Sequence, residues 1–532
     1  MLRNFYEKFA SLDALLALLS GVLMALSFPK AEFSSFAFFS LIPLLYALHR
    51  PQKRLTALTC GMITGFVFFM GTLYWVTYTM ENYGQIPKSL SLFILVVLSL
   101  YLSFYPGLFA WGVNRMQKTG IPLLIGAPSL WTALEYARGH LLTGFPWALL
   151  GYTQYKNLLM IQMADITGVY GVSFLLVMIN TVFVMMLIGM RNSFSVRSFF
   201  SHWITPVVIL GLSASYGAFR LHEIHSAEHK PWIRIGVVQG NIDQNRKWDA
   251  ASREQIMAVH TRLTRRASQE KPDLILWPEA SVPFFFMADK EYQSQILGLI
   301  DDLGVDILFG SPDYTVDQGV SRFYNSAFLV SPGARLKGKY DKIHLVPFGE
   351  YVPLRKALFF IKPIVDQIGD ITPGNQITLM QAGEGLCGTP ICFEIIFPDL
   401  VRKFVLKGAD FIATLTNDDW FGRSSAPYQH FSMAVFRAVE NRVPVVRSAN
   451  SGISGVIAQD GRIVRQTDIF VEDAFTEDLS RLKTGKTFYT RFGDLFTFLC
   501  IAAAVSSLCG PWIRRRVRGK NFRDLTTPDS RD

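Results

Sequence analysis

The first 220 residues alternate between long apolar runs and short polar or basic connections. Seven of these runs are long enough to cross a bilayer, which needs roughly 20 mostly apolar residues per helix, and an eighth follows near the end of the chain. The pattern predicts eight membrane-spanning helices, near Leu12–Phe28, Phe33–Leu48, Leu55–Val76, Leu90–Val113, Ile121–Ala137, Ile166–Met190, Trp203–Phe219 and Leu495–Ile513.

The basic residues between the predicted spans indicate which side each connection faces. Lysine and arginine in short loops are retained on the cytoplasmic side. They gather in alternate connections, at Arg3, Lys8, Arg50, Lys53, Arg54, Arg115, Lys118, Arg191 and Arg197, and in the tail, at Arg514, Arg515, Arg516, Arg518, Lys520 and Arg523. Arg3 and Lys8 also fit a secretory signal, but six further spans favour a retained anchor. Both termini are therefore expected inside, which puts the long segment after the seventh span outside the cytoplasm.

That long segment has a different texture, with short β-rich runs separated by charged, helix-compatible stretches. Hairpin turns are expected at Ser331-Pro332-Gly333 and Gln459-Asp460-Gly461, where glycine accepts a positive φ. The expected helices are Ser252–Lys271, Glu291–Leu303, Asp399–Gly408 and Gln429–Asn441. The expected strands are Ile233–Val238, Leu274–Trp277, Asp306–Gly310, Asn325–Val330, Gly388–Phe393, Phe411–Leu415, Val443–Arg447, Gly455–Ala458 and Ile463–Arg465.

These patterns predict a polytopic α-helical membrane domain joined to an α/β domain. The expected parts are a seven-span domain at 1–220, an extracytoplasmic α/β domain at 232–485, a final span at 495–513 and a basic cytoplasmic tail at 514–532. Composition agrees, since 50% of the residues are hydrophobic and 18% are charged. The net charge of +10 lies mostly between apolar runs, so it indicates topology and not a nucleic-acid partner.

The cysteines and histidines suggest neither a metal site nor a disulfide framework. Five cysteines form no CxxC pair, and an odd spacing along one predicted strand points Cys387 and Cys392 to opposite faces. The histidines at 222, 225 and 229 cluster just after the seventh span, where we expect them to be solvated or hydrogen-bonded. We expect no metal and no cofactor.

Two aromatic segments leave alternatives open. The loop Gly139–Met160 fits an aromatic belt at the membrane interface or, alternatively, a lipid entry surface facing the α/β domain. The stretch Val282–Met287 fits ordinary core packing or a wall beside an acyl chain, because it starts three residues after Glu279.

Three polar residues directly follow or end apolar strands, where side chains can point into a cleft above a sheet. They are Glu279, Lys342 and Cys392. A thiol near neutral pH is mostly protonated and needs a base or a positive charge to become a reactive thiolate. Glu279 can take the proton, and Lys342 can stabilise the thiolate and the negative oxygen that forms when a carbonyl is attacked. The set predicts acyl transfer through Cys392, with Glu350 as a partner for Lys342 or Glu279.

The segments Trp277-Pro278-Glu279, Lys342 to Glu350 and Ile391-Cys392-Phe393-Glu394 resemble the Glu-Lys-Cys motifs of the nitrilase (carbon–nitrogen hydrolase) superfamily. Within it, the whole chain is similar to the bacterial apolipoprotein N-acyltransferases. The resemblance implies an α-β-β-α sandwich, with Glu279 as general base, Lys342 as transition-state cation and Cys392 as nucleophile. It implies supporting or substrate-binding roles at Glu350, Trp248, Glu394, Phe393, Asn325 and Trp420; Phe393 stands where the family commonly has tyrosine.

The resemblance also implies a reaction in two steps. Cys392 takes an acyl chain from a phospholipid, with phosphatidylethanolamine as the implied donor, and forms a thioester. The N-terminal amine of diacylglyceryl-cysteine in an apolipoprotein then accepts the chain, which completes lipoprotein maturation. The implied location is the bacterial cytoplasmic (inner) membrane, with the α/β domain on the periplasmic side.

Two other functions compete with this interpretation. A membrane-tethered nitrilase-like amidase would keep the same three residues, but a soluble substrate gives no reason for eight spans. A transporter or lipid-binding protein would show paired charges at bilayer depth. Few are seen, since Glu135 and Asp165 lie near the ends of apolar segments.

Overall fold

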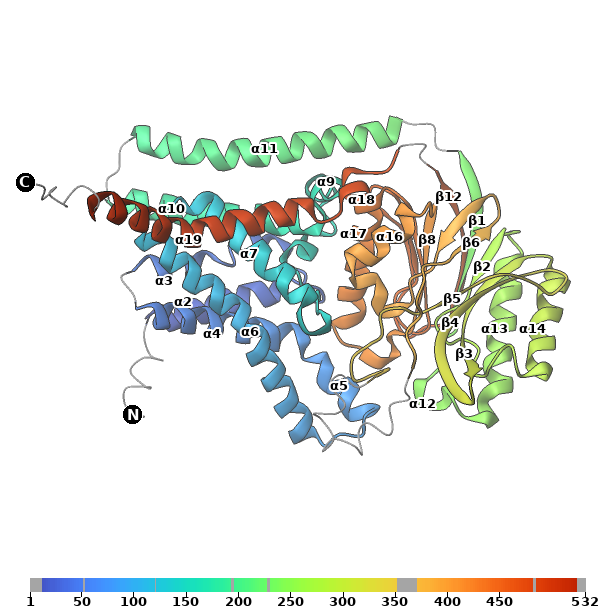
Figure 1. Cartoon of the computed structure of the whole chain (residues 1–532). Helices are drawn as coiled ribbons and strands as arrows, with labels where there is room; N and C mark the ends of the chain where they lie inside the picture. The colour runs from blue at the N-terminus through green and yellow to red at the C-terminus, as the bar shows by residue number, and fades with distance from the viewer. Residues whose placement is uncertain are drawn as a thin grey trace, which may run out of the picture.

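The computed structural model describes residues 12–50, 53–119, 121–192, 196–226, 230–351, 371–481 and 485–523. They form a helical domain, made of residues 12–226 and the last long helix, and an α/β domain at its end (Figure 1). The main helices of the helical domain are α2 (Leu12–Leu26), α3 (Ile42–His49), α4 (Arg54–Leu73), α5 (Trp75–Asn82), α6 (Lys88–Lys118), α7 (Leu123–His140), α10 (Val169–Asn192), α11 (Val196–Ser226) and α19 (Leu495–Arg523).

Helices occupy every segment for which the apolar pattern predicts a span. Among the described residues, three helices are long and apolar enough to cross a bilayer: α4, α6 and the part of α10 from Val169 to Gly189. Shorter apolar helices cover 12–26, 34–49, 158–167 and 495–509. Eight crossings therefore stay a prediction. Arg3 and Lys8, on which part of the topology prediction rests, and residues 524–532 of the predicted tail lie outside the described residues.

The second predicted span is not one helix. Its first part is the 3₁₀ turn η1 (Ser34–Phe38), and α3 begins only at Ile42. Pro43 lies in the first turn of α3, where its missing N–H leaves no helical hydrogen bond unmade. The buried amide of Asn180 joins the pieces, because Oδ1 accepts from the Leu41 N–H at 2.9 Å and Nδ2 donates to the Ala37 carbonyl at 2.9 Å.

The α/β domain contains two six-stranded sheets. The first has the order β12-β1-β2-β3-β4-β5 and the second the order β11-β10-β9-β8-β7-β6. The first sheet consists of β1 (Pro231–Gln239), β2 (Leu274–Leu276), β3 (Asp306–Asp317), β4 (Val320–Ser331), β5 (Arg335–Asp341) and β12 (Asp473–Ser480). The second consists of β6 (Leu379–Ala382), β7 (Gly385–Gly388), β8 (Phe411–Thr416), β9 (Val445–Ala449), β10 (Gly455–Ile457) and β11 (Ile463–Gln466).

Helices cover the outer faces of both sheets, which gives the expected α-β-β-α sandwich. Helices α13 (Arg253–Ser268) and α14 (Lys290–Leu303) cover the first sheet. Helices α16 (Pro398–Leu406) and α17 (Ala426–Asn441) lie between the second sheet and the helical domain (Figure 1). Alternation along β4 shows the layering, since Ala327 and Leu329 pack between the sheets while Phe328 and Val330 pack under α14.

Both predicted hairpin turns are confirmed. Strands β4 and β5 pair antiparallel around Gly333 (φ +76°), and β10 and β11 pair antiparallel around Gly461 (φ +87°). A third hairpin was missed in the sequence: β3 and β4 are longer than expected and pair from Ile307 to Asp317. Strand β12 was also missed, although it pairs with the whole of β1.

The expected strand Gly388–Phe393 is wrong. Strand β7 ends at Gly388, and Cys392 begins the 3₁₀ helix η6 (Cys392–Ile396). Pro390 has no N–H to offer a neighbouring strand, and Ile391 meets β8 through an isolated bridge to Leu415. Cys392 therefore lies on a turn beyond the strand.

The loop Gly139–Met160 does not form a lipid-facing aromatic belt. Trp147 and Tyr152 are each 1% exposed and lie against α17 of the α/β domain. The Trp147 indole donates to Gln429 Oε1 at 2.7 Å, and the Tyr152 hydroxyl accepts from Arg437 at 3.1 Å. The loop is a docking segment between the two domains.

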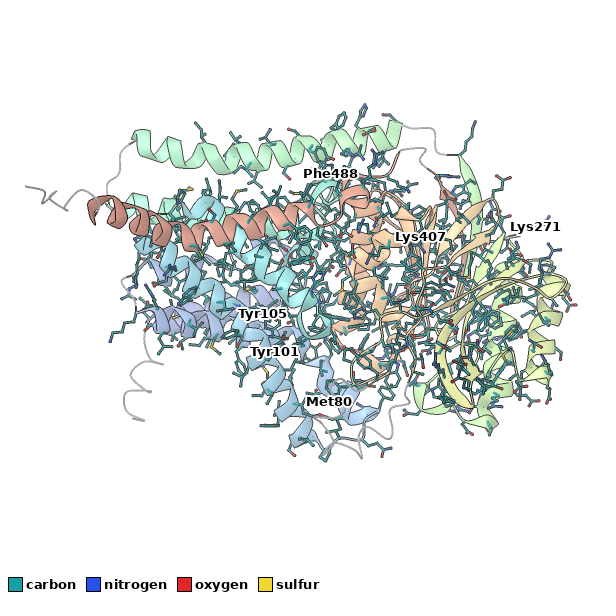
Figure 2. The ribbon with its side chains drawn as sticks, in the orientation of Figure 1. Met80, Tyr101, Tyr105, Lys271, Lys407 and Phe488 are labelled. Carbon is teal, nitrogen blue, oxygen red and sulfur yellow. The ribbon has the colours of Figure 1, made fainter. Side chains whose placement is uncertain are left out.

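Side chains labelled in Figure 2 mark parts of both domains. Tyr101 and Tyr105, labelled in Figure 2, lie one turn apart on α6 with their hydroxyls 3.0 Å apart. Met80 in the same view marks α5, which contacts the 3₁₀ helix η7 (Asp418–Phe421) of the α/β domain. Lys271 lies at the far end of that domain. Helix α5 is thus one place where the helical domain contacts the α/β domain.

Candidate active site

The three residues singled out in the sequence follow three different elements. Glu279 comes after β2, Lys342 comes directly after β5, and Cys392 begins η6. All three side chains are buried. Their charges influence one another, because Lys342 lowers and Glu279 raises the pKa of Cys392. The fold therefore brings the three groups into one site.

A glycine on the neighbouring strand makes room for the turn that carries Glu279. Gly310 in β3 donates to the Pro278 carbonyl at 3.2 Å. A Cβ atom at position 310 would lie 2.4 Å from the Ala280 nitrogen and 2.8 Å from the Glu279 Cα atom, closer than real contacts allow. Only glycine permits this approach, which fixes where the Glu279 side chain starts.

Two carboxylates share one lysine. Lys342 is 1% exposed, and its Nζ atom lies 2.9 Å from Glu350 Oε1 and 3.3 Å from Glu279 Oε1. Asn325 in β4 donates from Nδ2 to the same two oxygens, at 2.8 Å to Glu279 and 2.9 Å to Glu350. The structure thus places Glu350 and Asn325 where they hold Glu279 and Lys342 at a fixed separation.

Opposing effects act on the Lys342 ammonium. Burial lowers its pKa, but Glu279 and Glu350 raise it, and the net direction is upward. Lys342 therefore stays protonated and can act as a fixed positive charge. The second oxygen of Glu350 accepts from the Val346 N–H at 2.8 Å, so both Glu350 oxygens are engaged.

Cys392 has an unusual main chain. Its φ is +51°, in the left-handed region that non-glycine residues rarely adopt. Burial is the largest influence on the thiol and raises its pKa, and Glu279 and Asp418 act in the same direction. Lys342 and a backbone hydrogen bond from Asn417 lower it, and the net direction is upward. The resting thiol therefore keeps its proton and needs a base.

Glu394 connects two loops through hydrogen bonds. Its Oε1 atom accepts from the Tyr340 hydroxyl at 2.8 Å and from the N–H groups of Ile343 and His344 at 2.7 and 3.0 Å. Its Oε2 atom accepts from the Ile391 N–H at 2.7 Å. Burial raises the pKa of Glu394 to about 7, although these donors lower it. Glu394 thereby ties the loop after Lys342 to the turn before Cys392.

The sequence pointed to Trp248, but its neighbour Lys247 is the buried residue. Lys247 is fully covered, and its Nζ atom donates to the main-chain carbonyl of Glu279 at 3.0 Å. Burial lowers its pKa to about 8, against raising effects of Glu279, Asp419 and Cys392. Trp248 ends the short helix α12 (Gln244–Lys247) and is 52% exposed. Lys247 could have been found from its place beside Trp248 in a polar segment that follows β1.

Among the described contacts, neither Phe393 nor Trp420 makes a polar contact to the three residues. The Phe393 ring packs on Phe397 with centroids 5.2 Å apart. The Trp420 ring packs edge-on against Tyr83 at 4.9 Å, and its carbonyl accepts from the Thr79 hydroxyl at 2.8 Å. Trp420 therefore connects the α/β domain to the region around α5. The phenylalanines of Val282–Met287 are largely core, since Phe284 and Phe286 are buried under α14.

A buried ionic cluster behind Cys392 was missed in the sequence. Asp418 accepts from Arg447 Nη2 at 2.6 Å, and its other oxygen lies 2.9 Å from His430 Nδ1. His430 Nε2 lies 3.2 Å from the Cys392 carbonyl oxygen. These residues are 12 or more positions apart along the chain, so no local pattern joins them.

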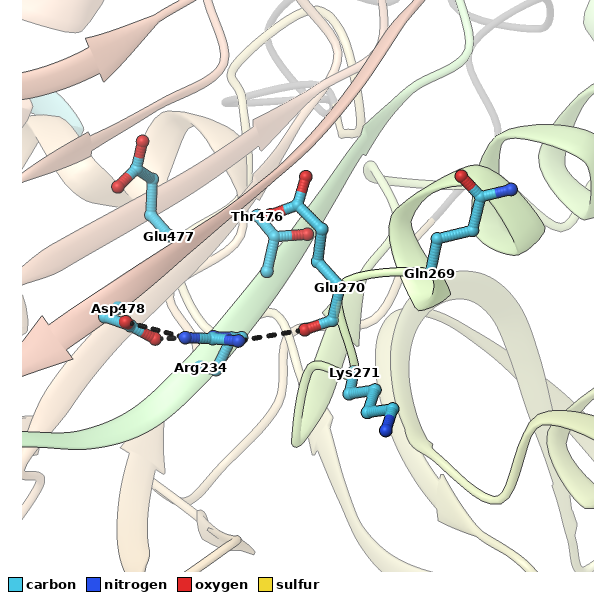
Figure 3. A pocket seen from close by; sticks show the side chains of 7 residues that line it. All are labelled: Arg234, Gln269, Glu270, Lys271, Thr476, Glu477 and Asp478. Atoms are coloured by element: carbon cyan, nitrogen blue, oxygen red, sulfur yellow. Dashed lines mark hydrogen bonds and ion pairs between the residues drawn. The ribbon is translucent and has the colours of Figure 1, made fainter.

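A surface pocket of about 410 Å³ lies elsewhere, at the opposite end of the parallel strands (Figure 3). It is lined by Arg234, Gln269, Glu270, Lys271, Thr476, Glu477 and Asp478. Arg234 is committed there, because it donates to Asp478 at 2.7 and 2.9 Å and to the Glu270 carbonyl at 3.1 Å. We therefore assign no chemistry to this pocket.

Comparison with known proteins matches both parts of the chain. Residues 20–182 match the apolipoprotein N-acyltransferase N-terminal domain, and residues 234–487 match the carbon-nitrogen hydrolase family. A relative from Geobacter metallireducens named apolipoprotein N-acyltransferase is 45% identical over 92% of this chain and 94% of its own length. One of the same name from Haemophilus influenzae is 30% identical over 90% and 91%. The solved amidase from Nesterenkonia sp. aligns with 48% of this chain and 94% of its own at 17% identity, with a TM-score of 0.37.

The sandwich with its buried glutamate, lysine and cysteine therefore defines an enzyme of the carbon–nitrogen hydrolase class. The helical domain indicates the branch within this class, because residues 20–182 match the N-terminal domain of apolipoprotein N-acyltransferases. The chain belongs to the apolipoprotein N-acyltransferase family.

Proposed function

We propose that this protein transfers an acyl chain from a phospholipid, through a thioester on Cys392, to the N-terminal amine of an apolipoprotein. The observation that carries the proposal is the buried contact of Lys342 with Glu279, in a site electrostatically coupled to the Cys392 thiol. The family to which the chain belongs supports the choice of lipid donor and lipoprotein acceptor.

In the first half-reaction the Cys392 sulfur attacks the ester carbonyl of the phospholipid. Glu279 takes the thiol proton, which the raised pKa of Cys392 keeps in place until then. Lys342 stabilises the negative oxygen of the tetrahedral intermediate. The intermediate breaks its bond to the glycerol oxygen, Glu279 returns the proton to that oxygen, and a lysophospholipid leaves.

In the second half-reaction the amine of diacylglyceryl-cysteine attacks the thioester. Glu279 accepts a proton from the amine, and the carbon–sulfur bond breaks to give the amide and the Cys392 thiolate. The proton returns from Glu279 to the sulfur, which restores the resting site. One base therefore serves both halves of the reaction.

Water would hydrolyse the thioester, so the site has to stay covered. The site's contacts with the helical domain favour this. Trp75, Trp147 and Phe421 form a ring cluster with centroids 4.8 to 5.8 Å apart at the boundary of the two domains. This boundary lies beside η7, on the side from which a membrane lipid would enter.

The finer features follow from the sequence patterns. We propose eight membrane crossings, an α/β domain on the periplasmic side of the bacterial inner membrane, and phosphatidylethanolamine as the donor. Glu279, Lys342 and Cys392 are proposed as catalytic. Glu350, Asn325 and Glu394 are proposed to position them, and Trp248, Phe393 and Trp420 to contact substrate or line its path.

Intact-mass measurement tests the acyl-enzyme. The full-length protein in detergent is mixed with phosphatidylethanolamine of one chain composition, and the mass is followed with time. We expect a gain of one acyl group that hydroxylamine removes, and no gain in the matched variant Cys392→Ala. A gain that survives in Cys392→Ala, or none in the wild type with any phospholipid, contradicts the proposal.

A further inference from the structure

The main chain of Cys392 is held from both sides. On the amino side, the Ile391 N–H donates to Glu394 at 2.7 Å. On the carboxyl side, the Cys392 carbonyl oxygen lies 3.2 Å from His430 Nε2. The residue between these two contacts has a φ of +51°, which costs free energy for a side chain with a Cβ atom. Such a conformation persists only where neighbouring groups hold it.

His430 is well placed to hold the carboxyl side. It lies in α17, is fully buried, and its Nδ1 atom is 2.9 Å from Asp418 Oδ1 and 3.1 Å from Arg447 Nη2. Both ring nitrogens face oxygens that can only accept, Asp418 Oδ1 at Nδ1 and the Cys392 carbonyl at Nε2. The His430 ring donates to Cys392 when Nε2 carries the proton, and Asp418 and Arg447 orient the ring from the opposite side.

Gln429, the residue before His430, makes hydrogen bonds with the helical domain. Gln429 donates from Nε2 to the Pro29 carbonyl at 3.0 Å and to the Thr72 carbonyl at 3.2 Å. Its Oε1 atom accepts from the Trp147 indole at 2.7 Å. Three separate segments of the helical domain thus converge on one side chain, next to the histidine that holds Cys392.

We propose that His430 is a positioning residue for the nucleophile, and that Gln429 makes this positioning depend on the docking of the helical domain. The inference rests on the proposed role of Cys392. One turn of α17 would connect the membrane helices to the reacting thiol, so that the Cys392 sulfur meets Glu279 and Lys342 in the right geometry only in the docked chain. This gives the helical domain a second task beside binding lipid.

Two substitutions of His430 that differ in reach give the sharpest test. In His430→Gln the side-chain nitrogen can occupy the place of Nε2, whereas in His430→Asn it reaches only as far as Nδ1. Both variants keep a polar amide, so they disturb the buried cluster to a similar degree. Thioester formation is measured in single turnovers over a range of phospholipid concentrations, together with thermal unfolding, on the full-length protein.

We expect His430→Asn to lower the saturating rate of thioester formation by about 10 to 100-fold, the loss that a small misplacement of a reacting group causes. The phospholipid concentration for half-saturation should not change, because His430 does not touch the lipid. His430→Gln should recover most of the rate at the same melting temperature. Equal rates in the two variants, or a change confined to half-saturation, overturn the proposal.

Gln429→Met tests the connection to the helical domain. It keeps the length of the side chain but removes the contacts to Pro29, Thr72 and Trp147. We expect the same pattern as in His430→Asn with a smaller loss, since the His430 donor remains. A wild-type rate in Gln429→Met would show that docking does not reach the nucleophile.

A matched control is the other buried histidine of the domain, His260, which lies in α13 with Nδ1 2.9 Å from the Ile256 carbonyl. His260→Gln should keep the wild-type rate even if it lowers the melting temperature. The outcomes separate two failures. If the wild type forms no thioester, the proposed function fails; if it does and His430→Asn is as fast, only the positioning role fails.

Discussion

Two buried carboxylates in this molecule are used in opposite ways. Glu279 accepts hydrogen bonds from Lys342 and Asn325, and among the described residues both donors bind the same oxygen, Oε1. Asp165, at the joint of the two domains, has both oxygens engaged. Oδ1 accepts from the Tyr216 hydroxyl at 2.7 Å, and Oδ2 accepts from Arg220 and Arg442, each at 2.8 Å.

This difference in hydrogen bonding fits two different roles: Glu279 takes part in the reaction, and Asp165 holds the two domains together. A carboxylate that must take and return a proton needs an oxygen that its neighbours leave available. A buried carboxylate that holds two domains together is more stable when both of its oxygens accept hydrogen bonds, because burial of an unpaired charge is costly. The same contrast sets Glu279 apart from Glu394 and Glu350, whose two oxygens both accept hydrogen bonds.

The largest expected effect comes from removing the base. Glu279→Gln keeps the size of the side chain and an oxygen for Lys342 and Asn325, but it cannot take a proton. We expect thioester formation to fall by about 10² to 10⁴-fold, the usual contribution of general acid–base catalysis. Single-turnover acylation measures it. An unchanged rate would mean that another group deprotonates Cys392 and that the available oxygen has no significance.

Replacing the shared cation should cost somewhat less. In Lys342→Met, Glu279 and Glu350 lose their shared counter-charge, and the oxyanion loses its stabilising group. We expect a loss of about 10² to 10³-fold in the acylation rate, as for removal of an oxyanion donor. If activity in Lys342→Met stays at the wild-type level, Lys342 has a structural role only.

For Asp165, which connects the two domains, we expect the opposite pattern: a loss of stability with little loss of acylation activity. Asp165→Asn leaves Arg220 and Arg442 without their shared counter-charge. We expect a loss of about 3 to 5 kcal/mol, typical of a broken buried ion pair, seen as a lower melting temperature in detergent. The acylation rate of the folded fraction should be kept.

Asp478→Asn is the matched control for Asp165→Asn. It breaks an exposed ion pair with Arg234, which should leave the melting temperature nearly unchanged. Similar melting temperatures for the two variants would argue against the fastening role of Asp165.

The last prediction concerns Lys247, and the expected effect depends on pH. Burial lowers the pKa of Lys247 to about 8 from an ordinary value of 10.5. Below pH 8 both folded and unfolded chains bind the proton, so the folded state bears the full cost of a buried charge. Between pH 8 and 10.5 the folded lysine loses its proton while the unfolded chain keeps it, which relieves that cost.

Lys247→Met removes this titration. The melting temperature of the wild type should therefore rise relative to Lys247→Met as the pH increases from 8 toward 10. A difference between the two proteins that stays constant across this range would show that Lys247 titrates normally. The variant also tests whether the positive charge under Glu279 assists acylation below pH 8.

Much of the fold could be predicted from local patterns, because apolar periodicity and turn residues act over a few positions. The eight apolar segments, the α/β alternation and the turns at Gly333 and Gly461 depend on such patterns. The proximity of Glu279 and Lys342 was also foreseeable, since both follow strands of the first sheet that end at the same edge, whereas Cys392 follows β7 of the second sheet. The longer hairpin of β3 and β4 was missed because its outer half is exposed and mixes polar with apolar residues.

The remainder depends on contacts that the chain makes over long distances. The positive φ of Cys392 arises where Pro390 ends the strand and Glu394 draws back the Ile391 N–H. The burial of Trp147 follows from its contact with Gln429, 282 residues away. An aromatic loop that packs against a second domain has the same composition as one that faces lipid, so the sequence could not separate them.

The most direct test of the account is the fate of the acyl-enzyme. The wild-type protein is first charged with a phospholipid and freed of excess lipid, and a synthetic diacylated lipopeptide with a free N-terminal amine is then added. We predict that the acyl mass leaves Cys392 and appears on the lipopeptide as an amide, faster than it is lost without the peptide. Release of the chain as free fatty acid, with no triacylated peptide formed, would contradict acyl transfer and indicate a hydrolase.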